Sequence, residues 1–130
     1  CVLIVDDNDI NIEVLKGLLT DTVESTFVCK DGRETIDLLK RQSKHKKRVI
    51  DLILLDCNMP VMDGFECTHL IRQGEAGDVY KNVPIIAVTA DAMLGDEDKC
   101  INAGMDDYLS KPINIIELLD KLKTWYVPNK

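Results

Sequence analysis

The sequence predicts an α/β fold in which five helices cover the two faces of a doubly wound, five-stranded parallel sheet. Five short apolar runs alternate with longer segments that carry apolar residues at helical spacing. The central run, residues 52–55, is apolar at every position, which is typical of a strand buried on both faces of a parallel sheet. A buried helix is the competing interpretation, but the run is short, and Pro60 and Gly64 follow it with turn chemistry.

Residues 1–5 are predicted as the first strand, which ends at the acidic pair Asp6 and Asp7. A helix follows, with Asn8 or Asp9 as its N-cap, because such side chains accept hydrogen bonds from the first amides of a helix. The predicted apolar stripe of this helix consists of Val14, Leu15, Leu18 and Leu19, with Asn11 one turn earlier.

The second strand is predicted at residues 26–29, and Asp31 and Gly32 form a turn before a second helix. The apolar residues of that helix are Ile36, Leu38 and Leu39. The run KRQSKHKKR at residues 40–48 then holds six of the sixteen Lys and Arg residues. Such a run can mark nuclear targeting or an acidic partner, but in this acidic domain we interpret it as a solvated loop.

After the central strand, a helix is predicted from about residue 63 to residue 72, followed by a loop over residues 73–82. Residues 84–88 form the fourth predicted strand. Residues 91–103 form a polar helix that ends before Gly104, the usual residue past a helix end.

The last strand is short and contains Tyr108 and Leu109. The final helix has Asn114 as its N-cap and Glu117 three residues later, which is the spacing of a capping box. Its apolar stripe consists of Ile115, Leu118, Leu119, Leu122 and Trp125 or Tyr126.

The composition indicates one globular domain. The chain has 130 residues, of which 45% are hydrophobic and 30% charged. Its net charge of −7 argues against nucleic acid as a partner, because phosphate binding needs a basic surface. No apolar stretch approaches the roughly 20 residues of a membrane span and no signal peptide is visible, so direct membrane contact is not expected.

The five cysteines are an odd number without a C-x-x-C pair, and most lie in apolar runs or predicted helices. We interpret them as reduced core residues of a cytoplasmic domain. The chain starts at Cys1, within a predicted strand and without an initiator Met. We therefore expect residues 1–130 to be one domain of a longer protein, which could itself be anchored in a membrane.

Polar side chains that can do chemistry follow four of the predicted strands. They are Asp6, Asp7, Asp56, Thr89 and Lys111. In a parallel sheet these strand ends meet at one edge, where three carboxylates would repel one another unless a cation joined them. All-oxygen ligands suit Mg²⁺, and a carboxylate, Mg²⁺, a lysine and a hydroxyl are together what phosphoryl transfer needs. Any one of these residues alone could merely cap a loop.

Four motifs occur in order over nearly the whole chain: VLIVDDN, LLDCNMPVMDG, PIIAVTA and AGMDDYLSKP. With these motifs the sequence resembles the receiver domains of two-component response regulators. The resemblance implies a flavodoxin-like receiver fold with strand order 2-1-3-4-5. Within the family, VDDNDIN, TADAM and AGMDDYLSKPI resemble receivers of hybrid histidine kinases more than regulators fused to DNA-binding domains.

At the matching positions, the resemblance implies that Asp56 accepts a phosphoryl group from a phosphohistidine in a phosphorelay, and that the domain then changes conformation. Mg²⁺ is the implied cofactor. Its implied ligands are Asp6, Asp7, Asp56 and the backbone carbonyl of Asn58.

The resemblance also assigns residues to catalysis, switching and phosphate lifetime. Lys111 and Thr89 would contact the phosphoryl oxygens, and Thr89 would act with Tyr108 as the conformational switch. Asn58 and Asp91, each two residues after a strand-end residue of the site, would tune how long the phosphoryl group survives.

The implied partner is a histidine kinase or a histidine phosphotransfer domain, since neither His45 nor His69 is near the strand ends. Ile10 and Ile12 fall on either side of the first helix's stripe, close to the acidic pair. We expect at least one of them to be exposed at the rim of the site, where it would dock the phosphohistidine carrier. The resembling hybrid-kinase receivers use this helix face to bind four-helix phosphotransfer domains. Two stray surface isoleucines are the plain alternative.

Two other functions remain open from the sequence. A small Mg²⁺-dependent phosphatase of the haloacid dehalogenase kind would need an acid two residues after Asp56, where this chain has Asn58. A binding module that never takes phosphate would show no labelling of Asp56. In the favoured interpretation, the domain catalyses only its own phosphorylation and dephosphorylation, and histidine kinase activity would belong to the parent chain.

Overall fold

The computed structural model describes residues 1–43, 49–57, 61–89, 96–111 and 113–126. Its strands form one sheet in the order β2-β1-β3-β4-β5, with every neighbouring pair parallel. The predicted strand order and parallel sheet are confirmed. The strands are β1 Val2–Val5, β2 Thr26–Cys29, β3 Leu52–Asp56, β4 Ile85–Thr89 and β5 Asp107–Ser110.

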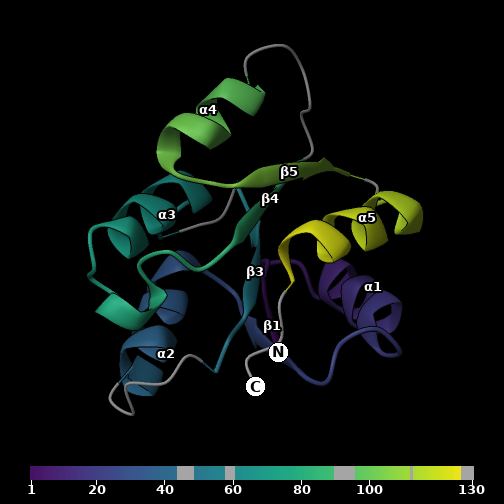
Figure 1. Ribbon diagram of the computed structural model, residues 1–130, viewed down its shortest axis with the longest axis horizontal. Helices are drawn as coiled ribbons and strands as arrows, with labels where there is room; N and C mark the ends of the chain where they lie inside the picture. The colour runs from purple at the N-terminus through teal and green to yellow at the C-terminus, as the bar shows by residue number, and fades with distance from the viewer. Residues whose placement is uncertain (44–48, 58–60, 90–95, 112, 127–130) are drawn as a thin grey trace.

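Helices cover both faces of the sheet. Within the described residues they are α1 Asp9–Leu19, α2 Gly32–Ser43, α3 Gly64–Arg72, the short 3-10 helix η1 Asp78–Tyr80, α4 Asp96–Ala103 and α5 Ile115–Trp125. Helices α1 and α5 lie on one side of the sheet, and α2 and α3 lie on the other (Figure 1). The buried residue Cys100 of α4 belongs to the core on the α2 and α3 side.

The core is divided by the sheet into two apolar clusters. Successive residues of β1 alternate between them, so that Val2 and Ile4 pack toward α1 and α5 while Leu3 and Val5 pack toward α2 and α3. Strands β1, β3 and β4 are buried at every position. Burial on both faces explains why the sequence of these strands shows unbroken apolar runs. No helix of the described residues has the length and apolar composition needed to cross a bilayer.

Helix α1 buries Leu15 and Leu19 as predicted, but Ile12 takes the place predicted for Val14. Ile12, Leu15 and Leu19 are buried, whereas Val14 is 50% exposed. The observed residues follow the spacing i, i+3, i+7, which is as helical as the predicted spacing. Packing against the sheet, rather than local pattern, therefore selects the buried face.

Two helices begin at their predicted caps. Asn8 and Asn114 each accept hydrogen bonds from two amides of the following turn, at 2.8 to 3.3 Å. The structure adds Asp63, whose carboxylate accepts the amide of Glu66 and caps α3. Ile115 directly follows the Asn114 cap and is exposed, so its predicted place in the buried stripe of α5 is wrong.

The predicted loop from residue 40 is also wrong in its first part, because α2 continues to Ser43. Lys40 and Arg41 lie exposed in its last turn, where a positive charge interacts favourably with the helix dipole. Residues 44–48 of the basic run lie outside the described residues.

The predicted loop over residues 73–82 contains η1 and a fully buried tyrosine, Tyr80. Its hydroxyl accepts the amides of Val49 and Ile50 at 3.0 and 3.3 Å and donates to Gln42 at 3.1 Å. These hydrogen bonds satisfy the phenol inside the core.

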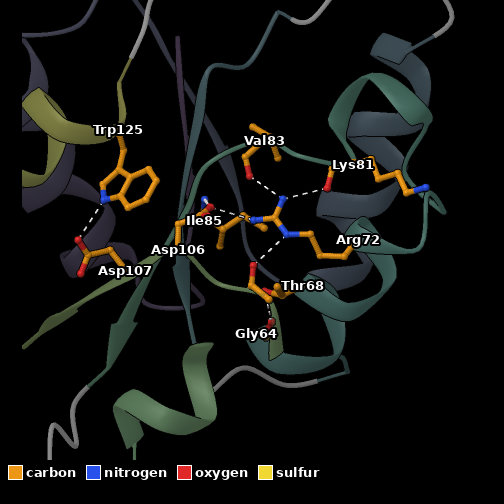
Figure 2. Close-up of polar contacts among 10 residues, drawn as sticks. Gly64, Thr68, Arg72, Lys81, Val83, Ile85, Asp106, Asp107 and Trp125 are labelled. Carbon is orange, nitrogen blue, oxygen red and sulfur yellow. Dashed lines mark hydrogen bonds and ion pairs between the residues drawn. The ribbon is translucent and has the colours of Figure 1, made fainter. Parts of the chain in front are cut away.

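Arg72, the last residue of α3, ties three segments together (Figure 2). Its guanidinium donates at 2.7 to 3.0 Å to the carbonyl oxygens of Gly104, Lys81 and Val83 and to Asp106 Oδ2. The same Asp106 oxygen accepts the amide of Ile85 at 2.9 Å. Burial lowers the pKa of Arg72 from its ordinary value, and Asp106 acts against this shift. The ion pair therefore holds α3 against the beginnings of β4 and β5.

Candidate functional site

The candidate site lies at the carboxyl edge of the sheet. Asp6 directly follows β1, Asp56 ends β3 and Thr89 ends β4, and these strands pair in parallel. Lys111 directly follows β5, and its amide donates to the carbonyl oxygen of Thr89 at 2.8 Å. Parallel register thus brings residues from four distant parts of the chain to one edge, as the sequence predicts.

Three carboxylates meet there. Oxygen atoms of Asp6, Asp7 and Asp56 all lie within 4.8 Å of one another. Asp6 and Asp56 are only 1% and 3% exposed, whereas Asp7 faces solvent. The cluster is therefore open on one side, where a ligand can approach.

Lys111 supplies positive charge to this cluster. Its Nζ lies 3.5 Å from Asp6 Oδ2 and 3.5 Å from Asp56 Oδ2. Within the part of the chain that the structure describes, this ammonium pairs with two of the three carboxylates, which leaves an excess of negative charge in a largely buried place. Like charges at this separation are costly unless a further cation binds.

Asp6 gives independent evidence that a cation fits. Its Oδ1 accepts the amide of Asn8 at 2.9 Å, but, among the described residues, its buried Oδ2 has no hydrogen-bond donor. The Lys111 ammonium lies 3.5 Å away, which is long for a hydrogen bond, and a buried acceptor that lacks a donor altogether costs about 1–3 kcal/mol. A divalent cation would satisfy this oxygen, and the all-oxygen donor set of Asp6, Asp7 and Asp56 suits a hard ion.

Thr89 and Tyr108 lie on the two neighbouring strands β4 and β5. Thr89 is buried at the end of β4, beside Ser110 in register, and Tyr108 is half-buried two residues before Ser110. The Nζ of Lys121 lies 5.9 Å from the centre of the Tyr108 ring. Thr89 is thus near the acidic cluster, and Tyr108 lies farther back along β5.

Two predicted residues, Asn58 and Asp91, lie outside the described residues. The two isoleucines of α1 differ from each other. Ile10 is 74% exposed, as expected for a docking residue, whereas Ile12 is 5% exposed and packs in the core with Leu15. The docking role predicted for Ile12 is therefore wrong, because its side chain is buried in the core between the sheet and helices α1 and α5.

A groove beside the cluster was not anticipated from the sequence. It has a volume of about 160 Å³ and is mostly apolar. Its lining consists of Asp6, Asn11, Val14, Leu15, Val88, Lys111 and Ile113. The sequence pattern predicted Val14 to be buried in the core, whereas it lines this groove. The groove could therefore not be predicted from that stripe.

Comparison with known proteins identifies the family. The model of the response regulator receiver domain matches residues 2–123. Hybrid signal transduction histidine kinase I of Dictyostelium discoideum is 42% identical over 123 residues, which are 95% of this chain and 7% of that protein. The histidine-protein kinase BarA of Escherichia coli is 39% identical over 127 residues, which are 98% of this chain and 13% of that protein. The chain thus spans only a small part of these relatives.

Solved structures agree with these matches. The receiver domain of the sensor histidine kinase PA1611 from Pseudomonas aeruginosa, with a magnesium ion in its active site cleft, has a TM-score of 0.80 and 37% identity. That match covers 95% of this chain and 94% of the other. The receiver domain of Saccharomyces cerevisiae Ssk1, in a co-crystal with the histidine phosphotransfer protein Ypd1, has a TM-score of 0.80 and 32% identity. That match covers 96% of this chain and 87% of the other.

The phosphatase alternative gains no support from these matches. The fold, the strand-end residues and the family model agree. The chain belongs to the response regulator receiver domain family, and its domain is homologous to the receiver domains of hybrid histidine kinases.

Proposed function

We propose that this domain accepts a phosphoryl group on Asp56 from a phosphohistidine of a partner protein. The observation that carries the proposal is the arrangement around Asp56. Its carboxylate is buried at the end of β3, within 4.8 Å of two further carboxylates and 3.5 Å from the Lys111 ammonium. This is a carboxylate nucleophile with the charge compensation that an incoming phosphoryl group needs.

In this reaction, an Asp56 carboxylate oxygen forms a bond to phosphorus as the bond from phosphorus to the histidine nitrogen breaks. The electron pair of that bond stays on the imidazole nitrogen. Lys111 is 3.5 Å from the nucleophile and would pair with a phosphoryl oxygen, while the hydroxyl of Thr89 would donate a hydrogen bond to another.

Mg²⁺ is the proposed cofactor. Asp6, Asp7 and Asp56 would hold it. The resemblance to receiver domains adds the backbone carbonyl of Asn58, a residue outside the described part of the chain. When bound, the ion neutralises charge on the phosphoryl oxygens. Two observations support this assignment: the buried Oδ2 of Asp6 accepts no hydrogen bond among the described residues, and the PA1611 receiver holds a magnesium ion in its active site cleft.

Phosphorylation is proposed to shift a two-state equilibrium of the domain. Thr89 would move toward the phosphoryl group, and Tyr108 on the adjacent strand would respond. Asn58 and Asp91 would flank the path of the hydrolytic water and set the lifetime of the acyl phosphate.

The proposed partner is a histidine phosphotransfer domain or a histidine kinase. The co-crystal of Ypd1 with the Ssk1 receiver supports this class of partner. On this chain, the exposed side chains of Ile10 and Val14 and the apolar groove next to Asp6 and Lys111 would form the docking surface. Apolar contact at this rim would exclude water while the phosphohistidine reaches Asp56 in line.

Similarity to hybrid kinases suggests the wider setting. We propose that the domain is part of a hybrid sensor histidine kinase and works in the cytoplasm. The identity to two such kinases supports the first point, and the buried thiols of all five cysteines support a reducing compartment.

The test is phosphoryl transfer from a phosphorylated histidine phosphotransfer protein to the purified domain in the presence of Mg²⁺. We expect stoichiometric, self-limiting labelling of the wild type and none of Asp56→Asn, which keeps the shape but lacks the nucleophile. Labelling of that variant at the wild-type rate would refute the assignment. Turnover of a generic phosphate monoester would favour the phosphatase instead.

A further inference from the structure

Two cysteines that are distant in sequence meet beside the phosphoacceptor. Cys57 directly follows Asp56, and Cys100 lies in α4, 43 residues later. Their Sγ atoms are 4.0 Å apart, and the residues are 2% and 1% exposed. The proposed phosphotransfer assigns no role to either thiol.

From this contact we propose that Cys57 and Cys100 are a dithiol that hydrogen peroxide oxidises to an intramolecular disulfide. The proposal goes beyond the phosphoacceptor function and does not depend on it. A disulfide has an S–S distance of about 2.05 Å, so the two sulfur atoms must approach by about 2 Å. The question is which of the two segments can supply this movement.

The Cys57 segment is held firmly. Its amide donates to the carbonyl oxygen of Val88 and its carbonyl accepts the amide of Gly64, both at 3.1 Å. A Cβ atom added to Gly64 would clash with the carbonyl oxygen of Asp56 and lie 2.9 Å from Cys57 Cα. The start of α3 therefore packs against this turn without spare room, and the approach must come from side-chain rotation or from α4.

The reaction balances in two steps. One sulfur attacks the peroxide, so that an S–O bond forms, the O–O bond breaks and water leaves with that thiol's proton. The second sulfur then attacks the resulting sulfenic acid, so that the S–S bond forms, the S–O bond breaks and a second water leaves with the second proton. Two thiols lose two electrons, and one peroxide becomes two waters. The product is the same whichever sulfur reacts first.

Burial selects the oxidant. A small neutral peroxide can reach thiols that are almost fully enclosed, whereas a bulky disulfide such as oxidised glutathione cannot. Two other thiols of the same core, Cys29 and Cys67, have pKa values that burial raises to about 11 and about 12. The disulfide would tether α4 to the turn that follows Asp56.

The experiment treats the purified domain with hydrogen peroxide and counts thiols after denaturation in an alkylating agent. We expect the count to fall from five to three, with a loss of two hydrogens in the intact mass. Non-reducing digestion should yield one peptide pair joined through Cys57 and Cys100, and dithiothreitol should restore five thiols. Oxidised glutathione should leave the count unchanged.

Variants separate this pair from the other thiols. Cys29→Ala should still lose two of its four thiols, whereas Cys57→Ala and Cys100→Ala should keep all four. Should either of the latter fail to fold, the peptide map of the wild type decides. Five remaining thiols, a different cross-linked pair, or oxidation of Cys57 or Cys100 to a sulfinic acid without a disulfide would overturn the proposal.

Discussion

Replacing Asp56 with Asn should stabilise the domain in the absence of metal, although it removes the proposed nucleophile. The carboxylate of Asp56 lies at most 4.8 Å from those of Asp6 and Asp7 and 3.5 Å from the ammonium of Lys111. At an effective dielectric constant of about 20, each carboxylate repels it by about 3.5 kcal/mol and the ammonium attracts it by about 4.7 kcal/mol. The net repulsion from these three groups is about 2 kcal/mol, and screening at the exposed Asp7 lowers it toward about 1 kcal/mol.

Urea denaturation in a chelator and in Mg²⁺ measures this effect. In chelator, we expect the free energy of unfolding of Asp56→Asn to exceed that of the wild type by about 1–2 kcal/mol. Mg²⁺ at about 100 times its dissociation constant should add about 2.7 kcal/mol to the wild type, and less to the variant, which lacks one ligand. The difference in free energy of unfolding between the variant and the wild type should therefore narrow, or change sign, when Mg²⁺ is added.

Asp106→Asn is the matched control, because the same chemical change is made where the carboxylate is paired. Asp106 accepts Arg72 Nη2 and the amide of Ile85, both at 2.9 Å. Losing the charge-assisted hydrogen bond should destabilise the domain by about 2 kcal/mol, with no dependence on Mg²⁺. Two results would contradict the electrostatic argument. In one, Asp56→Asn is less stable than the wild type in chelator; in the other, Mg²⁺ stabilises the variant as much as it stabilises the wild type.

Three further predictions concern the site and its partner. Asp7→Ala should weaken both Mg²⁺ binding and phosphoryl labelling when each is measured against Mg²⁺ concentration. Labelling that survives chelation of the metal would remove Mg²⁺ from the mechanism. Changing Asn58 and Asp91 together should alter the dephosphorylation rate by more than about tenfold, or roughly 1.4 kcal/mol of barrier, and an unchanged decay of the label would count against their tuning role. Ile10→Ala should slow phosphoryl transfer from a histidine phosphotransfer protein but not from acetyl phosphate. The control is Ile101→Ala, which removes another exposed isoleucine, on α4. Equal slowing with both donors would mean that Ile10 shapes the site and does not recognise the partner.

The acidic site was predictable because it depends on topology rather than on detail. Once the apolar runs are assigned to parallel strands, Asp6, Asp56, Thr89 and Lys111 must meet at one edge. The strands β1, β3 and β4 are buried on both faces, so their apolar runs are unbroken and easy to recognise.

The errors arose where long-range packing decides between equivalent local patterns. Ile12 and Val14 are two residues apart and so lie on nearly opposite sides of α1, and packing against the sheet and α5 determines which one is buried. The hydroxyl of the buried Tyr80 accepts hydrogen bonds from the amides of Val49 and Ile50, about 30 residues away, and no local pattern shows such a long-range contact. The contact of Cys57 with Cys100, 43 residues apart, was hidden for the same reason.

The central claim, that Asp56 is the phosphoacceptor, is tested most directly by locating the acyl phosphate. The domain is phosphorylated by a histidine phosphotransfer protein in Mg²⁺ and treated with borohydride, which reduces an aspartyl phosphate to homoserine. Peptide mass spectrometry then locates the modified residue. We predict homoserine at position 56 and at no other aspartate, and none when the donor or Mg²⁺ is omitted. Homoserine at Asp6 or Asp7 with Asp56 intact, or a labelled domain without any homoserine, would contradict the account.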